Sequence, residues 1–174
     1  MQEPHIPLQQ NGREASVRSS LFLIKRNHRP AIDKHFDTTL KTNLYGYFQI
    51  AQAVVAEMTP GSAIVNTESV TGILGNKNLI GYSMAKGQNS CLHPRFAGNL
   101  VSKGIRVNAV ALGPVWTPLN PSNKDAEDIL RFGADTPTKR SAQPEEIAPA
   151  YVHLASAHCS SDITGEILPI VGGY

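Results

Sequence analysis

Three residues of types that can move protons are spaced for a shared site: Ser69, Tyr82 and Lys86. Lys86 follows Tyr82 by four residues, so on a helix the phenol and the ammonium group would lie one turn apart on the same face. A free tyrosine has a pKa of about 10, and a neighbouring cation is expected to lower this pKa. The pattern predicts that Tyr82 acts as an acid or a base near neutral pH, with the Ser69 hydroxyl beside it.

Hydrophobic periodicity predicts the elements that position these residues. The apolar run from Ser62 to Asn66 is typical of a buried strand, which would end shortly before Ser69. The helix with Tyr82 is expected to begin near Gly81 and to run toward Lys103, since a glycine follows that lysine.

One residue argues against a straight helix here, because Pro94 falls inside the predicted segment. A proline removes a backbone donor and clashes with the preceding turn, which costs about 3 kcal/mol unless the helix is kinked or broken there. The neighbouring residues from Gln88 to His93 also lack a convincing apolar stripe. The continuation of the helix past Pro94 is therefore poorly supported by the sequence.

A longer helix is predicted upstream, between Ala31 and Met58, where apolar residues recur every three or four positions as one buried face requires. Asn43 lies in the middle of this helix, where an asparagine is usually an exposed polar residue. A further buried strand is expected at residues 105–112 and a final strand at residues 166–171, with a helix starting at Pro144 between them. Alternating helices and buried strands predict an α/β fold, with a parallel sheet covered by helices on both faces.

Composition narrows the function classes. The chain has 174 residues, of which 41% are hydrophobic and 17% charged, as in one globular domain. The net charge of +2 is dispersed, which argues against a nucleic-acid partner. Two cysteines without metal-ligand spacing predict no metal site, and the absence of a long apolar run predicts no membrane segment. These features favour a cytoplasmic protein.

Several motifs together resemble the short-chain dehydrogenase/reductase family, whose mark is Tyr-x-x-x-Lys with an upstream serine. The stretch TNLYGYF around Asn43 resembles the family's helix with a fourth catalytic residue. The stretch RVNAVALGPVWTP resembles its strand and nicotinamide-side loop, and ITGEILPIVGG resembles its closing strand. The match covers about residues 36–174 in the family's order, and NTESVTGILGNKNLIGYS is similar to the branch of glucose and ribitol dehydrogenases.

The resemblance implies a role for each matching residue. Tyr82 would exchange a proton with an alcohol or carbonyl substrate, while Lys86 would lower the Tyr82 pKa and hold the nicotinamide ribose. Ser69 would hydrogen-bond the substrate oxygen, and Asn43 would support a water that connects Lys86 to solvent. The cofactor is NAD or NADP, the substrate is a small molecule, and a homo-oligomer is compatible with the family. Three positions match the cofactor-facing loop: Gly113, Val115 and Thr117.

The chain also departs from the family pattern. It contains no GxGxxG or GxxxGxG turn to hold a pyrophosphate. We therefore expect a Rossmann-like sheet that lacks the N-terminal part of the doubly wound fold, with residues 1–30 irregular and residues 31–174 forming the catalytic half of an NAD(P)-binding domain. Leu112 stands where the family usually has proline, and Glu68 stands where it has a small residue.

Two interpretations follow from these departures. In the first, the chain is an NAD(P)-dependent dehydrogenase or reductase whose N-terminal half is truncated. In the second, it is a catalytically silent remnant that acts only as an oligomerisation or interaction module. On either interpretation we expect the chain by itself to bind NAD(P) weakly or not at all, because the phosphate cradle is missing.

Overall fold

The computed structural model describes residues 29–120 and 126–173, with side chains from residue 33 onward. Predictions for residues 1–28 lie outside the described residues. Contacts between Cα atoms divide the chain between Thr38 and Thr39, and the sheet lies in the second unit. Its helices and strands are η2 (Lys41–Tyr45), α3 (Gly46–Val55), β1 (Ala63–Ser69), α4 (Val70–Leu74), α5 (Ile80–Leu100), η3 (Val101–Lys103), β2 (Arg106–Leu112), α7 (Ala126–Leu130), α8 (Pro144–Ala155), α9 (Ala157–Ser160) and β3 (Ile167–Ile170).

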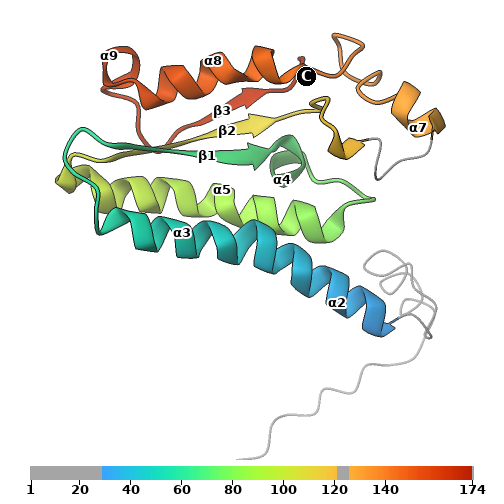
Figure 1. The fold of residues 1–174 in the computed structure, drawn as a ribbon, viewed down its shortest axis with the longest axis horizontal. Coiled ribbons are helices and arrows are strands. Elements are labelled where there is room, and N and C mark those ends of the chain that lie inside the picture. The colour runs from blue at the N-terminus through green and yellow to red at the C-terminus, as the bar shows by residue number, and fades with distance from the viewer. Residues whose placement is uncertain (1–28, 121–125, 174) are drawn as a thin grey trace, which may run out of the picture. The chain divides into compact units, whose positions relative to one another are not determined.

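A parallel sheet of three strands, in the order β1-β2-β3, forms the centre of this unit. The register pairs Ala63 with Arg106 at one end of β1 and Ser69 with Leu112 at the other. Helices α3 and α5 cover one face of the sheet, and α8 covers the other (Figure 1). The predicted Rossmann-like α/β fold, a parallel sheet with helices on both faces, is confirmed.

The core lies in two layers, one on each face of the sheet. On the α5 face, Ala97 and Leu100 pack against Ile105 and Val107, with Ile64 of β1 at the margin. On the α8 face, the buried cluster consists of Val110, Ala150 and Leu154, and Val65 packs against it. Consecutive residues of β1 therefore point to opposite layers, as the pleat of a strand requires.

Strand β1 is longer than predicted. The sequence indicated a strand that ended at Asn66, whereas the structure extends it through Thr67 and Glu68 to Ser69. The added residues are polar and do not form an apolar run, but each is paired with the apolar strand β2. Parallel pairing with β2, which local sequence cannot reveal, thus places Ser69 at the end of a strand.

Helix α5 continues past Pro94 to Leu100, so this proline does not end the helix. The turns beyond Pro94 contribute Ala97 and Leu100 to the core, and this burial offsets the cost of the proline. The predicted end of the helix is confirmed: η3 follows at once, and Gly104 adopts the left-handed conformation with φ of 69°.

The upstream helical region is also confirmed, as α2 (Arg29–Leu40), η2 and α3 in succession, but it is not one regular α-helix. Residues Lys41–Tyr45 form a π-helix, in which the Gly46 N–H donates to the Lys41 carbonyl five residues back. The sequence predicted one buried apolar face along this region, which would include Phe48. This prediction is wrong at Phe48, a residue that is 47% exposed, whereas Ala51 is buried.

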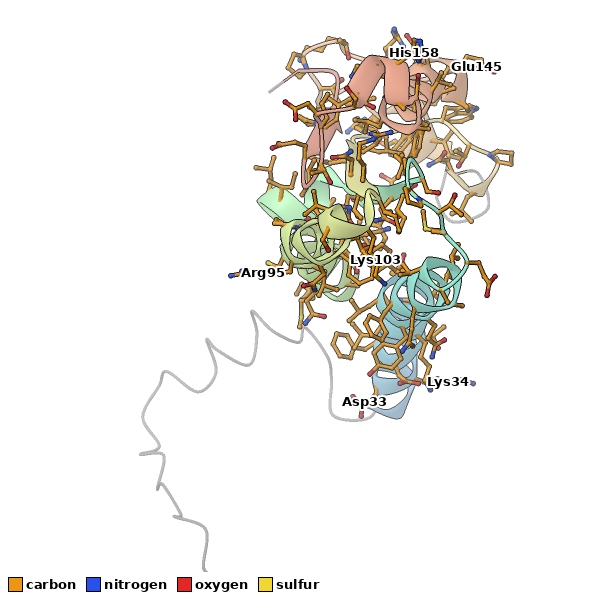
Figure 2. The ribbon with its side chains drawn as sticks, turned by 90° about the vertical axis from the view of Figure 1, so that its left-hand side faces the viewer. Asp33, Lys34, Arg95, Lys103, Glu145 and His158 are labelled. Atoms are coloured by element: carbon orange, nitrogen blue, oxygen red, sulfur yellow. The ribbon has the colours of Figure 1, made fainter. Side chains whose placement is uncertain are left out.

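Charged side chains mark the outer surfaces of the two helical layers. Figure 2 shows Arg95 and Lys103 on the α5 side of the sheet and Glu145 and His158 on the α8 side. None of the helices in the described ranges combines the length and the apolar character that crossing a membrane requires.

Candidate active site

The predicted catalytic residues gather at the carboxyl end of the parallel sheet. Ser69 is the last residue of β1 and pairs with Leu112, the last residue of β2, so Ser69 lies next to the start of the loop at Gly113. Tyr82 and Lys86 lie on α5, which packs against both strands. In open parallel sheets the crevice at this edge is where ligands bind.

Ser69 connects the strand to the next helix. Its hydroxyl oxygen accepts a hydrogen bond of 3.2 Å from the Thr71 N–H and caps the N-terminus of α4. The same hydroxyl lies 3.0 Å from the Thr71 hydroxyl and also hydrogen-bonds the Tyr82 phenol, which lowers the pKa of Tyr82. The strand end and the cap together fix the serine beside the phenol.

Tyr82 and Lys86 lie on one face of α5, as their spacing predicted. The Lys86 ammonium is 5.8 Å from the centre of the Tyr82 ring. It donates a hydrogen bond of 2.8 Å to the main-chain carbonyl of Thr67 on β1. This bond anchors the cation to the strand, two residues before Ser69.

The lowering of the Tyr82 pKa expected from Lys86 is outweighed by burial in this structure. The pKa of Tyr82 is raised from its ordinary value of 10.0, chiefly because burial disfavours the phenolate. The Ser69 hydrogen bond lowers this pKa and the negative charge of Glu68 raises it, but Lys86 is not among the causes. Burial also lowers the pKa of Lys86, against a rise caused by Glu68. Tyr82 is consequently a protonated phenol at neutral pH.

Asn43 lies in the π-helix η2, where its side chain and its main-chain carbonyl each form a hydrogen bond. Its side-chain nitrogen donates to the Thr39 carbonyl at 3.1 Å. Its own main-chain carbonyl accepts a hydrogen bond of 2.9 Å from the side chain of Asn89 on α5. Asn43 is therefore linked to the active-site helix through Asn89.

The loop after β2 contains the three predicted cofactor-facing residues. A Cβ atom on Gly113 would lie 2.8 Å from the Cα atom of Val171, so the glycine permits close contact with the end of β3. Val115 forms a parallel bridge with Ala142. The Thr117 N–H and hydroxyl both donate to the side-chain oxygen of Asn120, at 2.6 Å and 3.2 Å. The loop is thus held by its own contacts at the same sheet edge as Ser69.

Sequence reasoning gave Glu68 no function, yet it is a distinctive group of this site. Its side chain is fully buried, and neither carboxyl oxygen has a hydrogen-bond partner among the described residues. The pleat of β1 turns Thr67 toward α8, where its hydroxyl meets that of Tyr151 at 2.7 Å, and Glu68 toward α5. Burial raises the pKa of Glu68 to about 7, although the charge of Lys86 lowers it.

A layer of polar side chains surrounds Glu68 between β1 and α5. Glu68 lies 3.9 Å from Nδ1 of His93, and the amide nitrogen of Asn66 contacts Nε2 of His93 at 3.2 Å. The same amide donates to the Tyr47 hydroxyl at 2.8 Å. Asn89 and His93, one turn apart on α5, face this polar side of β1, which explains why this part of the helix lacks an apolar stripe. The sequence could have indicated the layer in two ways. Polar residues stand two apart in the strand, at Asn66 and Glu68, and four apart in the helix, at Asn89 and His93.

The residues at this edge fit the nicotinamide end of a dinucleotide. Only one of the three N–H donors of Lys86 has a partner within the described residues, which leaves donors to hold ribose hydroxyls. Tyr82 is half-buried and presents a phenol beside the Ser69 hydroxyl. A protonated phenol, a hydroxyl and an ammonium group at one place can stabilise and protonate an oxygen on which charge develops.

Comparisons with known proteins agree with this arrangement. The family model adh_short_C2, described as enoyl-(acyl carrier protein) reductase, matches residues 20–174. The chain is 45% identical over 81% of its length to glucose and ribitol dehydrogenase homolog 2 of Arabidopsis thaliana. It is 43% identical, over the same share, to the chloroplastic NADPH-dependent aldehyde reductase 1 of that plant and to glucose and ribitol dehydrogenase of Daucus carota. It spans 49%, 49% and 48% of these relatives, about half of their length.

Proposed function

We propose that this chain, which belongs to the short-chain dehydrogenase/reductase family, supplies the proton-transfer site of an NAD(P)-dependent interconversion of an alcohol and a carbonyl. Membership of the family confirms the resemblance predicted from the sequence, including the likeness to glucose and ribitol dehydrogenases. The observation that carries the proposal is the meeting of Ser69, Tyr82 and Lys86 at the carboxyl edge of β1. Residues 31–174 form the catalytic half of the domain in this proposal.

Tyr82 is the acid and base of the proposed reaction. The phenol holds its proton at neutral pH, as an ordinary tyrosine does, and can donate it to a carbonyl oxygen as that oxygen becomes an alkoxide. Ser69 donates a hydrogen bond to the same oxygen and stabilises the developing charge. The nicotinamide, when bound, supplies or accepts the hydride.

Lys86 and Asn43 serve this site from outside the reacting atoms. Lys86, fixed by the Thr67 carbonyl, would hold the nicotinamide ribose with its remaining donors. Asn43, which is bonded to α5 through Asn89, would support a water that connects Lys86 to solvent. The backbone of Gly113 and Val115 and the Thr117 hydroxyl would hold the carboxamide of the same cofactor.

The name of one relative, an NADPH-dependent aldehyde reductase, supports an aldehyde as the substrate class. Two other relatives are named for glucose and ribitol, which supports polyhydroxylated substrates with an aldehyde or a secondary alcohol. We therefore propose a small polar aldehyde or its alcohol as the substrate of this chain, with NAD or NADP as cofactor.

The test uses the chain with small aldehydes and two hydride donors, NADPH and reduced nicotinamide mononucleotide, which has only the nicotinamide half. We expect aldehyde-dependent oxidation of a donor, and a rate about 100-fold lower in Tyr82→Phe because the general acid is lost. Tyr45→Phe removes a hydroxyl from a side chain that is 50% exposed and is the matched control. Equal rates in wild type and Tyr82→Phe would overturn the proposal. A folded wild type that oxidises neither donor would favour the silent module instead.

A further inference from the structure

We propose that Glu68, a buried carboxyl beside His93, holds a proton that it can lose, and that it is a positioning residue whose charge acts on Tyr82 and Lys86. The inference rests on the proposed function for the roles of Tyr82 and Lys86. It concerns the layer between β1 and α5, behind the surface that would face a substrate.

The first support is the burial of the pair. The Glu68 and His93 side chains are both 0% exposed, and Oε1 of Glu68 lies 3.9 Å from Nδ1 of His93. A buried carboxylate without hydrogen bonds is strongly disfavoured, so a carboxyl in this position holds a proton more readily than one in water. The Asn89 side-chain oxygen is a second buried acceptor without a partner in the described part of the chain.

The second support is that His93 gives Glu68 no hydrogen bond. Nδ1 lies 3.1 Å from the Asn89 carbonyl, which can only accept, so Nδ1 donates its hydrogen there. Nε2 faces the side-chain amide of Asn66, which also contacts the Tyr47 hydroxyl. Both ring nitrogens of His93 therefore have partners other than Glu68, whose carboxyl oxygens are left without one among the described residues.

The third support is the set of groups around Glu68. The titratable residues that its charge affects are Tyr82 and Lys86 on α5 and Tyr47 on α3. His93 of α5 lies beside it, its register partner on β2 is Ala111, and α4 has no titratable side chain. The charge of Glu68 raises the pKa of Tyr82 and of Lys86. Loss of the Glu68 proton adds one negative charge beside both proposed catalytic groups.

The decisive experiment measures the Tyr82 phenolate by ultraviolet difference absorbance, with Tyr82→Phe as the blank for the other tyrosines. In Glu68→Gln the phenolate should form at a lower pH than in wild type, by about half a pH unit or more, because the nearby negative charge is gone. Glu57→Gln removes the same charge from an exposed position after α3 and should leave the midpoint unchanged. Equal midpoints in Glu68→Gln and Glu57→Gln would overturn the proposal.

A second measurement follows stability against pH. The pKa of Glu68 rises from 4.5 to about 7 in the folded state, so the folded protein binds more protons between these values. Its contribution to stability is therefore complete below pH 4.5 and is lost as the pH rises toward 7. The wild-type free energy of unfolding should decline relative to that of Glu68→Gln across this window. A constant difference between the two would contradict a proton held by Glu68.

If Glu68→Gln does not fold, the pH titration of the Glu68 carboxyl ¹³C resonance in the wild type tests the proposal. A midpoint near 7 supports a proton held by buried Glu68, and a midpoint near 4.5 overturns it. None of these measurements needs a cofactor or turnover, so the proposed function can fail its own test while this inference stands, and the reverse also holds.

Discussion

The side-chain amide of Asn89 on α5 donates a hydrogen bond of 2.9 Å to the main-chain oxygen of Asn43 in the π-helix η2. The two asparagines are 46 residues apart in the chain. The bond ties the helix that carries Tyr82 and Lys86 to the helical segment that carries the fourth predicted catalytic residue. The geometry of Asn43 therefore depends on a residue that the sequence did not single out.

Replacing Asn89 with alanine should destabilise the protein. The side chain is buried, and its loss leaves the Asn43 carbonyl without this donor, at a cost of about 1 to 3 kcal/mol. Urea unfolding followed by circular dichroism measures the change. Gln88→Ala is the control, because Gln88 is exposed on the same helix. A loss no larger than that of the control would show that the link carries no stability.

Gly72→Ala should disturb the Tyr82–Lys86 helix directly. A Cβ atom on Gly72 would lie 2.7 Å from the carbonyl carbon of Lys86 and 2.8 Å from the Gly87 nitrogen, so α4 and α5 would have to separate. Overpacking of this kind costs about 1 to 3 kcal/mol.

Gly98→Ala provides the matched substitution on α5. A Cβ atom there meets no other atom within 4 Å, so alanine should stabilise the helix by about 0.5 to 1 kcal/mol. Thermal unfolding of both variants gives the comparison. Shifts of the same sign in the two variants would contradict the close approach at Gly72.

Arg106→Met should destabilise the α8 layer. The buried guanidinium donates to the Leu154 carbonyl at 2.8 Å, to the Ala155 carbonyl at 3.1 Å and to the Ser160 hydroxyl at 2.9 Å. These groups close the C-terminus of α8, and their loss should cost about 2 kcal/mol or more. Arg95→Met is the control in urea unfolding, since Arg95 projects outward from α5 (Figure 2). Equal unfolding midpoints for the two variants would contradict this role.

Glu146 should make the protein sensitive to strong acid. Its carboxylate accepts hydrogen bonds from Arg140 at 2.7 Å and 2.6 Å and from the Gln143 N–H at 2.8 Å. These contacts, the Arg140 bonds above all, lower the pKa of Glu146 from 4.5 to about 2. The contribution to stability is present above pH 4.5 and is lost as the pH falls toward 2.

Acid unfolding of Glu146→Gln should therefore show a shallower decline in stability between pH 4.5 and 2 than the wild type. Glu145→Gln, at the neighbouring exposed position, should follow the wild-type curve (Figure 2). An unchanged slope in Glu146→Gln would show that the Arg140 contact does not persist in solution.

The sequence alone determined the features that depend on local geometry. Tyr82 and Lys86 share a helix face because they are four residues apart, and Gly104 ends the helix because its φ of 69° suits glycine. The alternation of helices and apolar strands along the chain was sufficient to predict a parallel sheet covered on both faces. The family could be predicted from the sequence motifs and their order along the chain alone.

Tertiary structure decided the features that depend on partners distant in sequence. Strand β1 reaches Ser69 because β2 pairs with its polar end, and Pro94 is tolerated because the turns after it pack in the core. The pKa of Tyr82 rises because burial outweighs the hydrogen bond from Ser69, a balance that spacing along a helix cannot reveal. Glu68 lies beside His93 only because the strand and the helix pack together. The same packing buries Glu68, and this burial raises its pKa.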